Sequence, residues 1–156
     1  MNKAPYPTVL RPVSSANNMR SLGKTVFEHR VHRSEGASVI ALDGELGSGK
    51  TTLSQGILSL LGAREPFPSP TFAIILRYDL PNVVDGIARV YHIDAYRVDA
   101  DALRDLDWEG MCNDTEALIL IEWAQRVASL LPHPRLCVHC AHTSNKSRTV
   151  TLTRCV

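Results

Sequence analysis

A glycine-rich segment is the part of this sequence best suited to chemistry. Residues 44–51, GELGSGKT, fit the pattern G-x-x-x-x-G-K-[ST], with a further glycine at position 47. Glycines let the backbone turn tightly, so successive amide groups can point at an anion near the start of the following helix. Lys50 can reach terminal phosphates, and the Thr51 hydroxyl can bind magnesium. We therefore expect the phosphates of a nucleoside triphosphate to be held by Glu45, Leu46, Gly47, Ser48, Gly49, Lys50, Thr51 and Thr52.

Two carboxylates follow apolar runs where they could complete such a site. Asp94 follows the run VYHI, and Glu122 follows the run LILI. In open α/β sheets, ligands bind beyond the carboxyl ends of the strands, so both side chains are expected near the phosphates. There they could bind Mg²⁺, directly or through water, and position the attacking water. The predicted catalytic residues are Lys50, Asp94 and Glu122, and the predicted Mg²⁺ ligands are Thr51, Asp94 and Glu122.

The segments around the loop have the pattern of a strand, a loop and a helix. Residues 38–43 form a short apolar run with β-branched residues, typical of a buried strand, and Asp43 at its end is expected to be structural. After the loop, apolar residues recur at helical spacing until Gly62. Because the motif requires this context, a phosphate loop is favoured over a chance glycine-rich turn.

The rest of the chain alternates further strands and helices. Strands are expected at 71–80, 88–94 and 117–121, and the first of them should end in a turn at Pro81-Asn82. Helices are expected at 99–107, closed by Gly110, and at 123–131. Two final strands, at 135–142 and 149–155, should form a C-terminal hairpin. Strands thus alternate with helices early and pair as hairpins later. This order predicts an α/β fold, a three-layer P-loop NTPase with a mixed β-sheet and helices on both faces.

Length and proline content predict the domain organisation. Residues 1–13 contain three prolines and are expected to form an extended N-terminal arm outside the core. A helix capped by Ser14 or Ser15 should follow, to about Arg33. The length of 156 residues fits one domain and leaves no room for a second catalytic domain. Residues 1–156 are therefore predicted to be a single P-loop ATPase domain.

Charge and hydropathy argue against several other kinds of function. The 17 basic and 16 acidic residues give a formal charge of +1, so no overall basic field favours DNA, RNA or an anionic membrane. The apolar runs are far shorter than the roughly 20 residues of a membrane helix, and the N-terminus has no signal-peptide pattern. We expect a soluble, cytoplasmic protein.

The four cysteines are expected to be reduced thiols. Cys137 and Cys140, with His139 and His142, could suggest zinc, but no second cysteine pair accompanies them. The stretch alternates like a strand, which would place Cys137 and Cys140 on opposite faces. Plain strand residues are the favoured interpretation.

Four segments of the chain, taken in order, resemble the TsaE family, also called YjeE. This family is the ATPase component of the bacterial machinery that makes threonylcarbamoyladenosine (t6A) in tRNA. The segments are GELGSGKTT at 44–52, SPTF at 69–72, YHIDAYR at 91–97 and IEW at 121–123. The loop alone is unspecific, whereas the other three segments in this order are much more specific. The resemblance covers roughly residues 14–132.

The resemblance implies slow, Mg²⁺-dependent ATP hydrolysis coupled to resetting a larger complex that modifies tRNA. It implies that Thr71 lies in a loop acting as a nucleotide switch beside the γ-phosphate, and that Trp123 lies close to the nucleotide. Asp94 and Glu122 would complete the shell around the metal and the attacking water. The implied partners are the proteins TsaD and TsaB, which would bind a face including the loop. Contact with tRNA would be indirect, and neither DNA nor membrane is an expected partner.

The chain departs from the family pattern at residues 124–125 and matches it only loosely at 105–110, and two other functions would use the same loop. Ala124 and Gln125 stand where the family usually has proline and often an acidic residue, and Gln125 could orient a water.

A small-molecule or nucleotide kinase would use the same loop but would need an acceptor pocket and an arginine-bearing lid. A switch would use its nucleotide state to control docking without useful turnover. The chain lacks the Asn-Lys-x-Asp signature of guanine recognition, so adenine is favoured by default.

Overall fold

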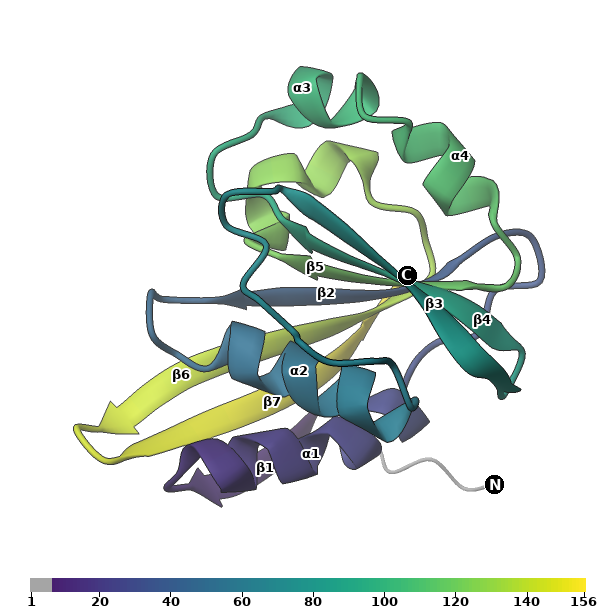
Figure 1. The fold of residues 1–156 in the computed structure, drawn as a ribbon. Coiled ribbons are helices and arrows are strands. Elements are labelled where there is room, and N and C mark those ends of the chain that lie inside the picture. Colours follow the sequence, from purple (N-terminus) through teal and green to yellow (C-terminus); the bar gives the residue numbers. More distant parts are fainter. Residues whose placement is uncertain (1–6) are drawn as a thin grey trace.

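A computed structural model describes residues 7–156 of the chain (Figure 1). The strands of this part are β1 (Thr8–Val13), β2 (Ser38–Gly44), β3 (Ile75–Val84), β4 (Ile87–Asp94), β5 (Ala117–Glu122), β6 (Arg135–Ser144) and β7 (Ser147–Cys155). Its helices are α1 (Ala16–Glu28), α2 (Lys50–Leu60), α3 (Ala100–Arg104), α4 (Trp108–Asn113) and the 3₁₀ helix η1 (Ala124–Leu130). None of these helices has the length and apolar character needed to span a membrane.

The described strands form one mixed sheet in the order β1-β7-β6-β2-β5-β4-β3. The four central strands β6, β2, β5 and β4 run parallel, while β1–β7, β6–β7 and β3–β4 pair antiparallel. The carboxyl ends of the parallel strands therefore meet at one edge of the sheet, where ligands bind in folds of this kind.

Helices cover both faces of the sheet (Figure 1). Along β2, Ile40 and Leu42 pack into the core shared with α1 and α2, while Val39 and Ala41 pack into the core shared with α3, α4 and η1. Successive strand residues point to opposite faces, so a strand buried on both sides must be apolar throughout. The predicted three-layer α/β fold with a mixed sheet is confirmed.

Two glycines bring α1 and α2 into close contact. A Cβ atom on Gly56 would collide with the backbone of Arg20, and one on Gly23 would lie 2.8 Å from the carbonyl carbon of Gly56. Ser15 caps α1, because its hydroxyl accepts a 3.1 Å hydrogen bond from the amide of Asn18. The close crossing thus holds the capped start of α1 beside the start of α2.

The expected N-terminal arm is corrected over the residues that the structure describes. Thr8–Val13 are extended, but as strand β1, with Thr8 opposite Leu152 of β7 and Val13 buried in the core. The proline at position 12 does not prevent this, because β1 is an edge strand and the ladder there shifts register. Residues 1–6 lie outside the described part. The following helix ends at Glu28 rather than near Arg33.

Two element boundaries also differ from expectation. The strand expected at 71–80 runs from Ile75 to Val84, since a register shift after Asp79 carries the edge strand past Pro81-Asn82 to a turn at Asp85. The helix expected at 99–107 is the shorter α3, and a separate helix, α4, begins after Asp107, which adopts a left-handed conformation with φ of 60°. Gly110 therefore lies inside α4 and does not close the helix before it.

A disulfide joins Cys137 of β6 to Cys155 of β7, so the expectation of four reduced thiols is wrong for this pair. The hairpin register places Cys137 opposite Thr153, two positions from Cys155, and the two Cα atoms lie 6.1 Å apart. Cys140 packs in the core on the other face of β6, as the strand alternation predicted. Burial raises the pKa of the Cys140 thiol to about 12, so the free thiol stays protonated at neutral pH.

Candidate nucleotide-binding site

The glycine-rich loop connects the end of β2 to the first turn of α2. Gly49 precedes the helix with φ of 105°, a left-handed value that favours glycine. The first backbone bond of the helix runs from the amide of Leu53 to the carbonyl of Gly49, at 2.9 Å. The amides before Leu53 at the helix start have no acceptor within the helix, so they can bind an anion with the help of the helix dipole.

Lys50 lies within this loop and not in solvent. The residue is only 5% exposed, and its Nζ donates hydrogen bonds of 2.6 Å to the carbonyl of Gly44 and 2.9 Å to that of Glu45. The ammonium also lies 4.1 Å from the centre of the Trp123 ring, a cation–π distance. Burial lowers the pKa of Lys50 from its usual value, and the negative charge of Glu122 opposes this shift.

Asp94 and Glu122 lie side by side at the carboxyl edge of the sheet. They are the last residues of the neighbouring parallel strands β4 and β5 and face each other in register. Both are buried, at 7% and 1% exposure. The hydroxyl of Thr51 donates a 2.7 Å hydrogen bond to Oε1 of Glu122. The fold therefore brings together the three residues expected to bind Mg²⁺.

His92 holds the other oxygen of Glu122, a contact that the sequence interpretation missed. The imidazole is fully buried on β4, and its Nε2 lies 3.2 Å from Oε2 of Glu122, so an N–H there can donate to the carboxylate. A histidine two residues before Asp94, in the otherwise apolar run VYHI, was the available signal, because residues two apart share a face.

The segment before β3 is tied to the end of β4. The hydroxyl of Thr71 donates a 3.0 Å hydrogen bond to Oδ2 of Asp94, and Oδ1 of the same carboxylate accepts from the amide of Tyr96 at 2.8 Å. The guanidinium of Arg97 donates to the carbonyl of Thr71 at 2.7 Å. The motifs SPTF and DAYR thus meet in space, and Arg97 is a further residue that the predicted site omitted.

The turn after β5 is fixed from two sides. Trp123 adopts a left-handed backbone conformation with φ of 58°, and its ring centre lies 4.9 Å from that of Tyr96. The side chain of Asp43 accepts a 3.0 Å hydrogen bond from the amide of Gln125. Asp43 therefore acts on the backbone of this turn, and the side chain of Gln125 is exposed.

Most of the predicted site residues line one cavity of about 260 Å³. Glu45 is the exception. It borders a neighbouring cavity of about 400 Å³ and contributes its carbonyl to Lys50. The predicted residues in the first cavity are Leu46, Gly47, Ser48, Gly49, Lys50, Thr51, Thr52, Thr71, Asp94, Glu122 and Trp123.

The oxygen donors of this cavity fit a magnesium ion bound together with phosphates. Thr51, Asp94 and Glu122 offer hard oxygen atoms, which Mg²⁺ prefers. Among residues 7–156, no group of three His, Cys, Asp or Glu side chains could hold a metal alone. Mg²⁺ in nucleotide sites is commonly held by one or two carboxylates and by the substrate's phosphates. The donor set therefore suits an ion that arrives with the nucleotide.

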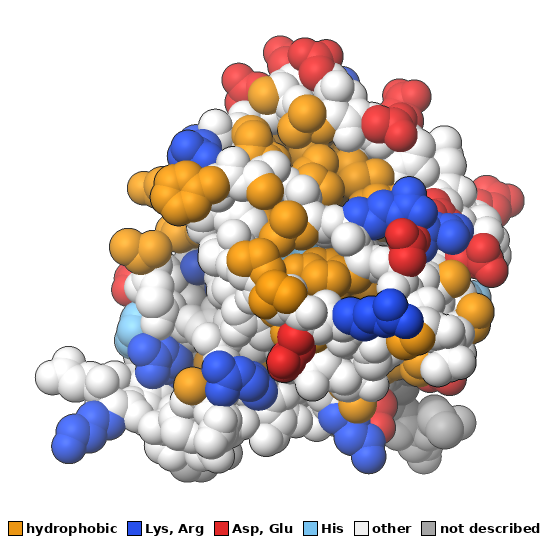
Figure 2. Space-filling view, viewed as in Figure 1, with side chains coloured by type: hydrophobic (Ala, Val, Ile, Leu, Met, Phe, Trp, Pro, Cys, Tyr) orange, Lys and Arg blue, Asp and Glu red, His pale blue; other side chains and the backbone are white. Residues whose placement is uncertain are grey.

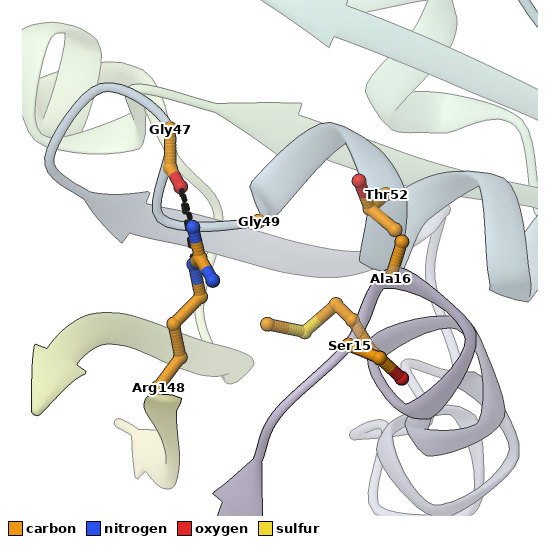
Figure 3. Close-up of a pocket in the computed structure, with 7 residues that line it drawn as sticks. Ser15, Ala16, Gly47, Gly49, Thr52 and Arg148 are labelled. Atoms are coloured by element: carbon orange, nitrogen blue, oxygen red, sulfur yellow. Dashed lines mark hydrogen bonds between the residues drawn. The ribbon is translucent and has the colours of Figure 1, made fainter. Parts of the chain in front are cut away.

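Arg148 of β7 reaches the loop from the far side. Its Nε and one terminal nitrogen donate to the carbonyl of Gly47, at 3.1 and 2.9 Å (Figure 3). No local pattern indicates this contact, because the two positions lie 101 residues apart and the last hairpin carries no phosphate-binding motif.

The loop between a buried strand and a helix, with carboxylates on the adjacent strands, defines the P-loop NTPase class of α/β proteins. Within this class, the chain belongs to the TsaE family. The family model described as threonylcarbamoyl adenosine biosynthesis protein TsaE matches residues 13–150. This match confirms the resemblance that the sequence motifs indicated.

Individual relatives agree with the family assignment. The chain is 35% identical over 115 residues to the tRNA threonylcarbamoyladenosine biosynthesis protein TsaE of Bacillus subtilis, which covers 74% of this chain and 68% of the relative. It is 39% identical over 94 residues to the protein of that name from Nostoc, an alignment that covers 58% of this chain and 54% of the relative. It is 36% identical over 120 residues to the protein of that name from Streptomyces coelicolor, which covers 76% of this chain and 75% of the relative. The crystal structure of Bacillus subtilis YdiB has the same fold, with a TM-score of 0.70 at 24% identity over 97% of this chain and 88% of that one.

Proposed function

We propose that this chain binds ATP with Mg²⁺, hydrolyses it slowly, and serves t6A modification of tRNA together with TsaD and TsaB proteins. The observation that carries the proposal is the register of Asp94 beside Glu122, with Glu122 bonded to the loop residue Thr51. A loop that binds phosphates needs carboxylates at this edge for a metal and for water. The relatives' names supply the pathway.

Each residue has a role that follows from its position. The loop amides and Lys50 hold the phosphates, and Lys50 would exchange its bonds to the loop carbonyls for bonds to phosphate oxygens. Thr51, Asp94 and Glu122 would hold Mg²⁺, which neutralises charge on the phosphates when bound. Glu122 is placed to orient the attacking water. Thr71 is hydrogen-bonded to Asp94, so a change at this end of the site would alter the position of the exposed segment that follows Thr71.

The lining of the cavity supports the proposed slow turnover. Among the described residues, Lys50 is the only cation that lines it. An arginine that reaches the terminal phosphate raises hydrolysis in related enzymes by about 10³ to 10⁵ fold. Arg97 is engaged with the backbone of Thr71 instead. We therefore infer that the chain alone turns over slowly and that binding of its partners over the loop raises the rate.

The charge pattern supports indirect contact with tRNA. On the face in Figure 2, Lys and Arg side chains are scattered among acidic and apolar ones, and acidic side chains gather over α3 and α4 at the top. Tight nucleic-acid binding rests on many phosphate contacts from clustered cations. We infer that the partners hold the tRNA and carry out the transfer chemistry, and that the chain works in the cytoplasm.

The test begins with ATP binding by calorimetry. Lys50→Ala should abolish binding because the loop loses its side-chain cation, while Lys24→Ala, at an exposed position of α1, should bind as the wild type does. Undiminished binding by Lys50→Ala would refute the phosphate-loop role. Phosphate release and t6A formation are then followed with and without TsaD and TsaB. A phosphorylated small acceptor that forms independently of these proteins would replace the proposal with a kinase.

A further inference from the structure

Strand β3 leaves one side of its backbone unpaired. It lies at an end of the sheet, where its one neighbouring strand within residues 7–156 is β4 (Figure 1). The strand at the other end of the sheet, β1, is shorter and contains a proline. A long open edge can pair with a further strand, and proteins usually block it with charges, prolines or bulges. In β3 the proline and the register shift come only after Asp79, so the first half of the strand stays open.

The alternation of the β3–β4 ladder decides which backbone groups face the open edge. The amide of Asp94 donates to the carbonyl of Ile74 at 2.9 Å, so these two residues form a hydrogen-bonded pair. Hydrogen-bonded and non-hydrogen-bonded pairs alternate along antiparallel strands. Arg77 and Asp79 lie an odd number of positions further along the same unbroken register, so their pairs with β4 are of the second kind. The N–H and C=O groups of Arg77 and Asp79 therefore point away from β4.

The same two residues carry opposite charges at this edge. Their side chains are 53% and 66% exposed, and the guanidinium of Arg77 donates to Oδ1 of Asp79 at 2.8 Å. The alternate residues turn to the other face of the sheet, where Tyr78 and Leu80 pack against the core shared with α1 and α2. Residues 76–80, LRYDL, thus have a leucine at each end, opposite charges one position inside, and a tyrosine at the centre.

Two copies of this segment complement each other in one antiparallel register. When the pairing is centred on Tyr78, Arg77 of each copy lies opposite Asp79 of the other. Both residues have outward backbone groups, so each of these two pairs can exchange two hydrogen bonds and one ion pair. A pairing centred on Arg77 or Asp79 would bring like charges together, which destabilises a sheet. A pairing centred on Leu76 or Leu80 would lose both ion pairs.

We propose that β3 is a dimerisation edge, at which a second copy of this chain pairs antiparallel with Tyr78 on the two-fold axis. The sheet of one copy then continues into the sheet of the other. A two-fold interface needs a surface that is complementary to itself, and residues 76–80 meet this condition in both their backbone groups and their charges. Because the paired segment is short, the association is expected to be weak and to depend on concentration.

Sedimentation equilibrium of the full chain without nucleotide measures this association, independently of the proposed function. The mass of wild type should rise from that of a monomer toward twice that value as the concentration approaches about 1 mM. Arg77→Asp and Asp79→Arg each place like charges opposite one another, so each should weaken association by about tenfold or more. Both positions are exposed, so folding should be retained. Lys24→Asp, at an exposed position of α1, is the control and should associate as wild type does.

A mixture of the two single variants gives the sharpest test. A pair made of one Arg77→Asp chain and one Asp79→Arg chain has opposite charges at both facing positions, so the mixture should associate at least as tightly as wild type. The double variant Arg77→Asp, Asp79→Arg should dimerise as wild type does. A wild type that stays monomeric up to about 1 mM would overturn the inference and leave the edge to a strand of another protein. Single variants that dimerise unchanged, or that do not associate when mixed, would also overturn it.

Discussion

Thr51, in the first turn of α2, donates a 2.7 Å hydrogen bond to Glu122, the last residue of β5 and 71 residues further along the chain. This bond connects the phosphate loop to the carboxyl edge of the sheet. It forms because β5 lies between β2 and β4 in the sheet, so Glu122 faces Leu42 just before the loop and Asp94 on the other side. One residue therefore links the loop, the sheet and the second carboxylate.

Glu122→Gln should suppress hydrolysis while sparing nucleotide binding. The amide keeps the size of the side chain and its contact with Thr51 but removes the negative charge that orients the attacking water. General-base action contributes about 10² to 10⁴ fold, so single-turnover phosphate release should fall by about 100-fold or more. ATP affinity, measured by calorimetry, should change by less than about threefold. Glu109→Gln on the surface of α4 is the control, and wild-type release by Glu122→Gln would make Glu122 structural.

His92 should stabilise the fold and support hydrolysis, because it hydrogen-bonds to the buried carboxylate of Glu122. His92→Leu leaves Oε2 of Glu122 without its donor, which should cost about 1–3 kcal/mol of the free energy of unfolding in urea. The variant should also hydrolyse ATP more slowly, since Glu122 loses its orientation. The double variant His92→Leu, Glu122→Leu removes both polar groups and should lose less stability than the sum of the single variants. Strict additivity would show that the two side chains are not coupled.

Local sequence signals were enough to predict where the glycine-rich loop and the two strand-end carboxylates lie. Gly44 to Thr51 carries its own pattern, and Asp94 and Glu122 end apolar runs, so neither prediction needed the register of the sheet. Contacts set by that register were not predictable. Arg148 meets Gly47 only because β7 pairs with β6, and β6 pairs with β2 beside the loop.

The same distinction explains the errors in the predicted fold. Strand β1 was mistaken for an arm because its prolines suggest loop structure, while the pairing with β7 that makes it a strand involves residues near the other end of the chain. The bond between Cys137 and Cys155 likewise depends on the register of β6 and β7, which composition does not reveal. Local breaks such as that at Asp107 depend on one residue's backbone conformation.

Gly56→Ala should destabilise the protein, although alanine favours helices. The added methyl would meet the backbone of Arg20 on α1, which cannot move as a flexible side chain would. Overpacking of this kind costs about 1–3 kcal/mol, more than the gain of up to about 1 kcal/mol in helix propensity. Urea unfolding should show the loss, whereas Ser59→Ala at an exposed position of α2 should change stability by less than about 0.5 kcal/mol. Equal stability of Gly56→Ala and wild type would mean that α1 and α2 can separate without cost.

The disulfide between Cys137 and Cys155 should stabilise the C-terminal hairpin and can be tested by reduction. A cross-link that closes a loop of this size restricts the unfolded chain and contributes about 3 kcal/mol. Cys137→Ser should therefore lower the free energy of unfolding by about this amount, and a reductant should lower that of wild type equally but leave Cys137→Ser unchanged. Cys112→Ser keeps the cross-link and should remain sensitive to the reductant. Mass spectrometry of the unreduced protein should find two hydrogens fewer than four thiols require, and a mass that matches four thiols would contradict the cross-link.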